Sequence, residues 1–202
     1  RCWLENHGVD TRYIRVVNDV YTASFFANTD KANAQISSFY AGAMAYAKEQ
    51  SIHDLQKETL DLVVISANDP TGMRRFAREC RELEIPYLYD PGQQVVRSPA
   101  EEIREGIIGA QSLFVNEYEF ELIQKHTGLT QEDIREEVDY VVVTCGECGS
   151  DIWVKDEYFH IPIVKPVQIA DPTGVGDAFR GGFLRGRRLD FSWQTCGQMG
   201  AL

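Results

Sequence analysis

The sequence has no long hydrophobic run and few basic residues. No apolar stretch of the 202-residue chain approaches the ~18 residues that a transmembrane helix needs, so no membrane partner is expected. Lysine and arginine number 20 against 31 aspartate and glutamate residues, which gives a formal net charge of −11. A field of this sign repels the phosphate backbone, so nucleic-acid binding is not expected either. The first residues also lack the pattern of a secretory signal.

Cysteine is sparse as well, with the five residues Cys2, Cys80, Cys145, Cys148 and Cys196. An odd and sparse set predicts reduced thiols and a cytoplasmic protein. Cys145 and Cys148 form a C-x-x-C pair, but the sequence has no second such pair and no histidine pair at zinc-ligand spacing. A zinc site or a redox motif is therefore disfavoured.

The sequence does contain a regular alternation of strand and helix patterns. Short, nearly all-apolar runs predict buried strands over 62–67, 85–90, 112–115 and 140–144. Capping residues and helical spacing predict helices over 70–84, 100–110, 117–126 and 130–138. This order predicts an α/β fold, with a mostly parallel central sheet covered by helices on both faces.

Two segments break the alternation and are predicted to form β-hairpins. Residues 17–40 contain the β-rich pieces VYTASFFAN and AQISSFY around a polar turn at 29–33. This hairpin is expected to project from the main domain. The second is expected over 151–164, with its turn near Lys155 and Asp156.

Four loops with polar or glycine-rich sequences occupy the positions where a parallel sheet binds ligands. They are PGQQ at 91–94, NEYE at 116–119, CGECGS at 145–150 and DPTGVGD at 171–177. In the last of these, turn residues precede a helical pattern. That is the order of a phosphate-binding loop, because the amides at a helix start are unpaired and the helix dipole attracts anions. A plain turn, with Asp177 as a helix cap, is the alternative.

Together these loops resemble the ribokinase/PfkB family of carbohydrate and nucleoside kinases. DPTGVGDAF at 171–179 is similar to the family's D-T-x-G-A-G-D-x-F, although Val175 stands where many members have alanine. Residues 116–119 match N-x-x-E and residues 144–149 match T-x-G-x-x-G, in the family's order. Within the family, the stretches 22–30, 34–44, 67–70 and 90–97 are most similar to bacterial adenosine kinases.

The resemblance implies one ribokinase-like, three-layer α/β/α kinase domain over residues 1–202, with residues 17–40 contributing to a small β lid. The family's early substrate-binding glycines and ribose-holding acid have no counterpart after Arg1. We therefore expect the chain to be truncated at both ends. Part of the substrate site would precede Arg1, and part of the adenine pocket would follow Leu202.

The resemblance also implies a base and an anion hole at the glycine-rich stretch. The amides of Gly174, Val175, Gly176 and Asp177 would hold the transferring phosphoryl group. Asp177 would accept the proton of the attacking hydroxyl. Thr173 is expected to contact ATP.

The remaining ATP contacts are expected in the two preceding loops. Asn116 and Glu119 would contact ATP and hold Mg²⁺, mainly through water, because hard oxygen ligands suit this ion. The same spacing equally fits a helix capping box. Thr144, Gly146 and Gly149 would line the nucleotide, with an ordinary turn as the alternative. A monovalent cation such as K⁺ is a further candidate cofactor.

The substrate contacts are expected on the lid and in the PGQQ loop. Phe25 and Phe39 would stack on a purine, unless they belong to a hydrophobic core. Gln93 and Gln94 would hydrogen-bond adenosine, or else be solvated loop residues. Arg97 would meet phosphate charge, or else form a surface ion pair.

These residues predict an ATP-dependent kinase of the adenosine 5′-hydroxyl, with AMP and ADP as products. The alternatives are a kinase of ribose or a related sugar and a catalytically silent nucleotide-binding protein of the same fold. A dinucleotide-binding oxidoreductase is disfavoured because Phe179 stands where the third glycine of G-x-G-x-x-G is needed, and G-x-x-x-x-G-K-[ST] is absent. The lid is also a candidate homodimer contact.

Overall fold

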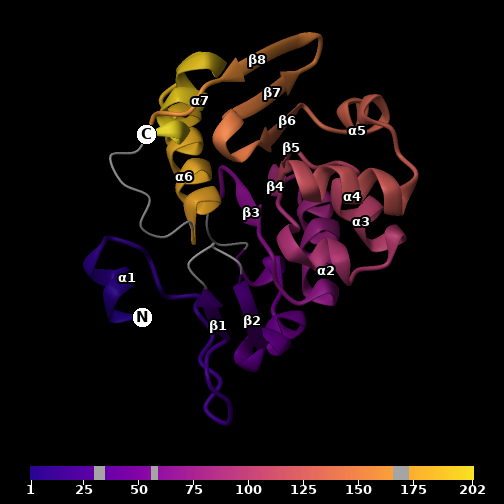
Figure 1. Cartoon of the computed structure of the whole chain (residues 1–202). Coiled ribbons are helices and arrows are strands. Elements are labelled where there is room, and N and C mark those ends of the chain that lie inside the picture. Colours follow the sequence, from indigo (N-terminus) through magenta and orange to yellow (C-terminus); the bar gives the residue numbers. More distant parts are fainter. Residues whose placement is uncertain (30–34, 56–58, 166–172) are drawn as a thin grey trace. The chain divides into compact units, whose positions relative to one another are not determined.

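The computed structural model describes residues 1–29, 35–55, 59–165 and 173–202, and it divides into two compact units, residues 1–47 and 48–202 (Figure 1). The first unit contains the helix α1 (Cys2–Asn6) and an antiparallel pair of strands, β1 (Ser24–Thr29) and β2 (Gln35–Tyr40). These strands confirm the hairpin predicted within 17–40. Residues 30–33 of its predicted turn lie outside the described residues. A 3-10 helix, η1 (Gly42–Glu49), follows β2.

The described part of the second unit contains a six-stranded sheet in the order β3-β4-β5-β6-β7-β8. The parallel strands are β3 (Val63–Ile65), β4 (Tyr87–Tyr89), β5 (Ser112–Asn116) and β6 (Tyr140–Thr144). The antiparallel strands are β7 (Ser150–Val154) and β8 (Glu157–Ile161). The mostly parallel sheet is confirmed, and the second predicted hairpin extends this sheet.

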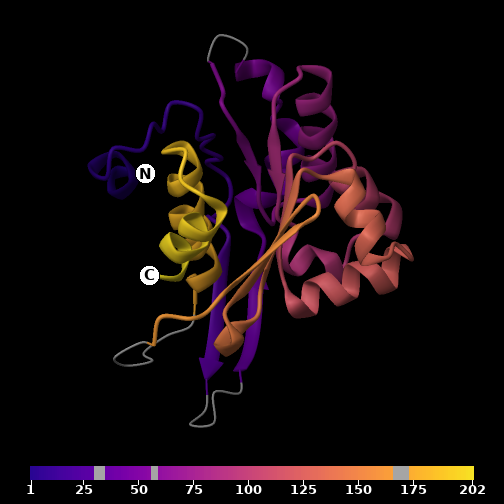
Figure 2. The same ribbon diagram turned by 90° about the horizontal axis from the view of Figure 1, so that it is seen from above.

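Helices cover both faces of the sheet, as the alternation predicts (Figures 1 and 2). One face carries α2 (Pro70–Glu82), α3 (Ala100–Ile107), α4 (Glu117–Thr127) and α5 (Gln131–Glu137). The other carries α6 (Val175–Arg188) and α7 (Trp193–Ala201). Short 3-10 helices lie at η2 (Ile52–Leu55), η3 (Gly92–Val96) and η4 (Gly146–Cys148).

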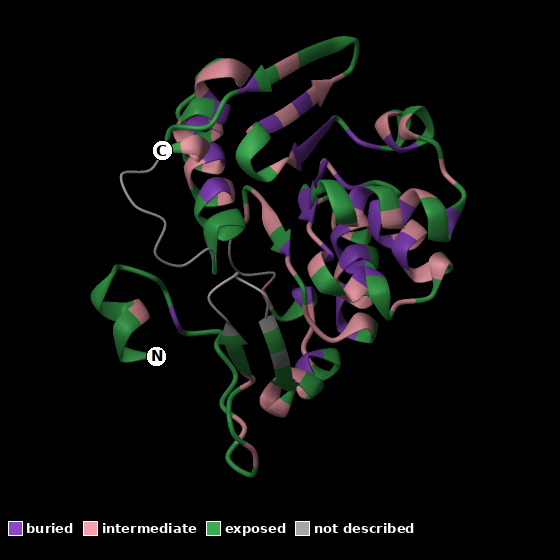
Figure 3. Ribbon diagram, in the orientation of Figure 1, coloured by how far each residue is buried: buried purple, intermediate pink, exposed green. Residues whose placement is uncertain are grey.

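Each face of the sheet has its own hydrophobic core because side chains alternate along a strand. On β6, Val141 and Val143 pack on the core beneath α2–α5, whereas Tyr140 and Val142 pack on the core beneath α6 and α7. In Figure 3 the buried colour follows the inner strands and the inward sides of the helices. This double burial is why the strands are almost wholly apolar.

Two helix ends differ by two or three residues from the predictions. Helix α2 ends at Glu82 because Glu84 adopts a left-handed φ of 54°. Helix α3 ends at Ile107, ahead of Gly109 with a φ of 76°. No helix in the described ranges is long and apolar enough to cross a membrane.

Candidate active site

The loops after the parallel strands meet at the carboxyl edge of the sheet. Asn116 ends β5 and pairs in register with Thr144, which ends β6. The Thr144 hydroxyl lies 3.5 Å from the carbonyl oxygen of Val115, a long contact that keeps the side chain beside β5. The predicted neighbours Asn116 and Thr144 are therefore brought together on adjacent strands.

Asn116 and Glu119 form a capping box at the start of α4. The Glu119 amide donates to Asn116 Oδ1 at 2.8 Å, and the Asn116 amide donates to Glu119 Oε2 at 3.0 Å. Burial raises the pKa of Glu119, while the hydrogen bonds from Asn116 act in the opposite direction. The capping interpretation is confirmed, and the role of these residues toward ATP and metal stays a prediction.

The donor set at this corner suits only a loosely held magnesium ion. The one side-chain oxygen of Asn116 and one of the two carboxylate oxygens of Glu119 already accept hydrogen bonds in the capping box. The described residues contain no cluster of three or more histidine, cysteine, aspartate or glutamate side chains that could hold a metal. Magnesium often keeps several waters and binds through one or two carboxylates together with substrate phosphates. The residues present fit that mode.

The two glycines of the loop after β6 have different structural roles. Gly146 has a φ of 52°, and a Cβ added there would meet no atom within 4 Å among the residues that the structure describes. Gly149 has a φ of 98°, and a Cβ there would lie 2.1 Å from the carbonyl oxygen of Ile161. Any side chain at position 149 would clash with the backbone, so the turn itself requires Gly149, as the turn interpretation holds. Position 146 has no such clash, and space remains beside it.

The C-x-x-C pair in this loop does not form a disulfide. Cys145 and Cys148 are both free thiols. Burial, followed by the nearby charge of Asp151, raises the pKa of Cys145 to about 11. A thiol with a raised pKa is a poor nucleophile at neutral pH.

The glycine-rich stretch ends in the first turn of α6. Gly174 is the N-cap residue, with a left-handed φ of 80°, and has no side chain that could cap the helix. The first amides of a helix have no partner within it. A Cβ added to Gly174 or Gly176 would meet no atom of the described residues within 4 Å, so none of these residues fills the space beside the amides, where an anion could bind. Thr173 and Val175 flank this turn and are exposed; Asp171 and Pro172 lie outside the described residues.

Asp177 forms an ion pair that anchors this turn to the sheet. Its carboxylate accepts a hydrogen bond from Arg180, whose guanidinium also pairs with Asp90. Asp90 directly follows β4, and its amide donates to the Ile65 carbonyl of β3 at 2.9 Å. The pair therefore holds the start of α6 at the carboxyl edge of the parallel strands. Asp177 is directed to Arg180 rather than capping the helix.

The predicted glutamine and arginine contacts lie just after Asp90. Gln93 and Gln94 belong to η3, and Arg97 follows it. Gln93 and Arg97 are exposed, and Gln94 is half-buried. The Gln94 carbonyl accepts hydrogen bonds from the amides of Arg97 and Ser98, at 3.0 and 2.8 Å, which fixes the turn. Their contacts with a substrate stay predictions.

Phe25 and Phe39 lie in the first unit as direct cross-strand partners of β1 and β2. Their rings therefore project from one face of the two-stranded sheet. They are 46% and 45% exposed, so the alternative that they are core residues is wrong. An exposed aromatic pair is the arrangement that the stacking prediction requires.

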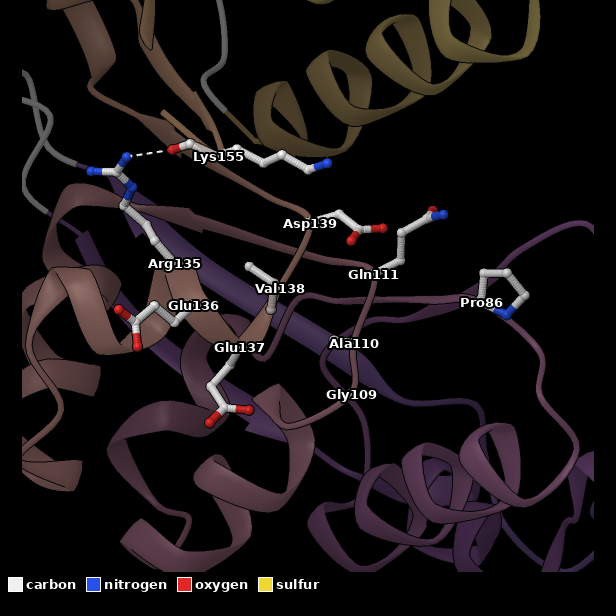
Figure 4. A pocket seen from close by; sticks show the side chains of 10 residues that line it. All are labelled: Pro86, Gly109, Ala110, Gln111, Arg135, Glu136, Glu137, Val138, Asp139 and Lys155. Atoms are coloured by element: carbon white, nitrogen blue, oxygen red, sulfur yellow. Dashed lines mark hydrogen bonds between the residues drawn. The ribbon is translucent and has the colours of Figure 1, made fainter. Parts of the chain in front are cut away.

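A pocket of about 600 Å³ lies at the opposite edge of the large sheet (Figure 4). It is lined by residues that precede strands, among them Pro86, Gln111 and Asp139. Arg135 donates there to the Lys155 carbonyl at 2.6 Å. Because parallel sheets bind their ligands at the carboxyl ends of the strands, this pocket is not the candidate active site.

Sequence reasoning missed Asp90 and Arg180. Asp90 begins the stretch 90–97 that carries the resemblance, and Arg180 directly follows the motif at 171–179. An arginine three residues after an acid on a helix is itself a recognisable pairing signal. That signal does not identify the second carboxylate, because Asp90 comes from a distant strand end.

Comparisons with known proteins show the family and the fold of the chain. Residues 1–202 match the model of the pfkB family of carbohydrate kinases. The chain is 31% identical to a nucleoside kinase of Methanocaldococcus jannaschii over 199 residues, covering 98% of the chain and 65% of that protein. The chain therefore spans less than two thirds of the length of this curated relative.

Solved structures show the same fold. The structure of Burkholderia thailandensis nucleoside kinase in complex with ADP-inosine has a TM-score of 0.92 and 32% identity, covering 99% of this chain and 62% of that one. A ribokinase of Thermotoga maritima has a TM-score of 0.73 at 24% identity, covering 99% of this chain and 67% of that one, and shows the fold alone. The fold is ribokinase-like, and the chain belongs to the pfkB family of carbohydrate kinases.

Proposed function

We propose that the protein is a phosphotransferase that uses ATP to phosphorylate the 5′-hydroxyl of adenosine, giving AMP and ADP. The observation that carries this proposal is the ion pair of Arg180 with Asp90. It holds Asp177 and the open amides of α6 at the sheet edge where Asn116 and Thr144 also lie. A base and an anion site at one edge are what phosphoryl transfer requires.

In this mechanism, Asp177 accepts the proton of the substrate hydroxyl as that oxygen attacks the γ-phosphorus of ATP. The bond between this phosphorus and the bridging oxygen breaks, and ADP leaves with the electron pair. The amides of Gly174, Val175 and Gly176 stabilise the charge on the transferred group without reorganising. The 76% exposure of the Asp177 side chain leaves it accessible to a substrate.

The loop residues on the same edge would hold the nucleotide. Thr144, Gly146 and Thr173 would contact ATP, and the open space at Gly146 supports close approach of a phosphate or ribose. Magnesium, bound through water beside Asn116 and Glu119, would neutralise phosphate charge. K⁺ would act as an activating monovalent cation.

The proposal that the phosphate acceptor is a nucleoside rests on the first unit, residues 1–47, and on the similar nucleoside kinases. The exposed pair Phe25 and Phe39 offers stacking surface for a purine. The nucleoside kinases of M. jannaschii and B. thailandensis support a nucleoside acceptor. Ribose or a related sugar is the second candidate, because the matching family model is that of carbohydrate kinases.

Two further properties belong to the proposal. The opposite face of the hairpin carries Phe26 and Ile36, which are 63% and 84% exposed and suit contact with a second copy of the chain. We propose a homodimer through this face. The five free thiols of the described residues support a cytoplasmic location.

The decisive measurement is ATP consumption by the whole protein with Mg²⁺, offering adenosine, inosine and ribose separately. We expect turnover with adenosine. Turnover with ribose alone would make the protein a sugar kinase, and binding of ATP without turnover on any acceptor would favour the catalytically silent protein.

Asp177→Asn tests the proposed base. This change keeps the side-chain shape and removes the proton acceptor, so kcat should fall about 10²- to 10⁴-fold. ADP affinity, measured by titration calorimetry, should change little because the amides of α6 remain. Normal turnover in Asp177→Asn would remove this residue from the mechanism.

A further inference from the structure

Arg180 is a nearly buried cation held between two carboxylates. Its side chain is only 12% exposed, and its two terminal nitrogens bind different partners, Asp90 through Nη1 and Asp177 through Nη2. Burial lowers the pKa of Arg180. A guanidinium is seldom buried this far unless charged partners compensate for its lost hydration.

The two carboxylates differ in their surroundings. Asp90 is 20% exposed and fixed at the end of β4, where its amide is bonded to β3. Asp177 is 76% exposed, in the first turn of α6. Because the planar fork of arginine holds its nitrogens in fixed directions, anchoring one of them on Asp90 orients the other toward Asp177. Asp90 thus fixes the guanidinium of Arg180, and Arg180 in turn holds the accessible carboxylate of Asp177.

The two glycines that precede Asp177 supply no side-chain contact that would fix its carboxylate. The turn before it contains Gly174 in the left-handed region and Gly176, and neither glycine packs a side chain against the sheet. A reacting group displaced by about 1 Å loses on the order of 100-fold in rate. A contact that fixes this carboxylate relative to the strands is therefore of direct value to catalysis.

We propose that Arg180 is a positioning residue that, docked on Asp90, holds the carboxylate of Asp177 in place for proton abstraction. Arg180 neither gives nor accepts a proton in this role, and it does not touch the substrate. The inference rests on the proposed function, because it assumes that Asp177 is the base.

The test compares kcat, KM for both substrates, ADP affinity and melting temperature in variants of the whole protein. Arg180→Gln should lower kcat about 10- to 100-fold and leave ADP affinity within about twofold. Arg180→Lys, which retains the charge but not the fork, should recover part of the loss. Asp90→Asn removes the negative charge that pairs with Arg180, so it should also lower kcat.

A matched control lies on the same helix. Arg188 pairs at 3.4 Å with Asp61, and both side chains are 70% exposed. Arg188→Gln should therefore leave kcat and melting temperature unchanged.

The double variant separates positioning from general support of the fold. Since Arg180 acts through Asp177, adding Arg180→Gln to Asp177→Asn should lower the residual rate no further. The inference would be overturned if the double variant lost as large a factor in kcat, relative to Asp177→Asn, as Arg180→Gln alone loses relative to the parent protein. An unchanged kcat in Arg180→Gln would also overturn it. If Asp177→Asn alone turns over normally, the proposed base and this inference both fail. If Asp177→Asn is inactive while Arg180→Gln is unimpaired, only the inference fails.

Discussion

At the scale of single residues, the role of an aromatic side chain depends on the face of the strand that carries it. Phe25 and Phe26 are neighbours in the sequence, but they project from opposite faces of the hairpin. Phe25 shares its face with Phe39, whereas Phe26 lies on the face of Ile36. One hairpin therefore has two separate apolar faces, and each suits a different contact.

This difference predicts the effect of Phe25→Ala on acceptor choice. Loss of one stacking ring should cost about 1–3 kcal/mol, which raises the KM for adenosine roughly 5- to 150-fold. The KM for ribose, which has no base to stack, should change little. Steady-state assays with both acceptors measure the difference, and an equal change for the two would contradict the stacking role.

The roles of several site residues could be predicted from the sequence only as alternatives. The spacing of Asn116 and Glu119 fits a capping box and a ligand pair equally well, and the structure confirms the first without testing the second. For Phe25 and Phe39 the structure excludes the core alternative. Burial and hydrogen-bond partners decide such cases, and a linear pattern does not contain them.

At the scale of elements, helices α6 and α7 approach each other closely through glycine. A Cβ on Gly182 of α6 would lie 2.3 Å from the Met199 carbonyl oxygen of α7. A Cβ on Gly200 of α7 would lie 2.8 Å from the Phe179 carbonyl oxygen of α6. These contacts hold the helix that begins at the candidate anion site.

Gly182→Ala should therefore destabilise the protein. The added methyl group overlaps the backbone, and relieving such overpacking costs about 1–3 kcal/mol. Gly181→Ala is the matched control, because a Cβ there meets no atom within 4 Å and alanine favours a helix by about 1 kcal/mol. Urea unfolding followed by circular dichroism measures both changes, and equal midpoints for the two variants would contradict the close packing.

Element boundaries were less predictable than element types. The strand and helix order of residues 62–144 follows the predicted alternation, but α2 and α3 end earlier than predicted. Positive φ values at Glu84 and Gly109 terminate these helices. Glutamate carries no strong stop signal of its own, so the end of α2 depends on the turn that leads into β4.

At the scale of the whole molecule, the exposed face of Phe26 and Ile36 predicts self-association. Ile36→Ser removes apolar surface from that face without altering the pair Phe25 and Phe39. We expect a shift from dimer to monomer in light scattering, with the KM for adenosine largely kept. Leu189→Ser, at the exposed apolar residue that follows α6, is the control and should leave the mass unchanged. A monomeric parent protein would contradict the dimer.

The sequence by itself determined the α/β class, the order of strands and helices and the polar or glycine-rich character of the loops. These depend on local periodicity, capping residues and turn residues, which are all properties of neighbours in the chain. Only the tertiary structure decided that Asp90 and Arg180 meet, and that α6 therefore begins at the carboxyl edge of the sheet. The physical reason is that a buried guanidinium needs compensating charge, and the fold supplies it from a strand end far away in the sequence.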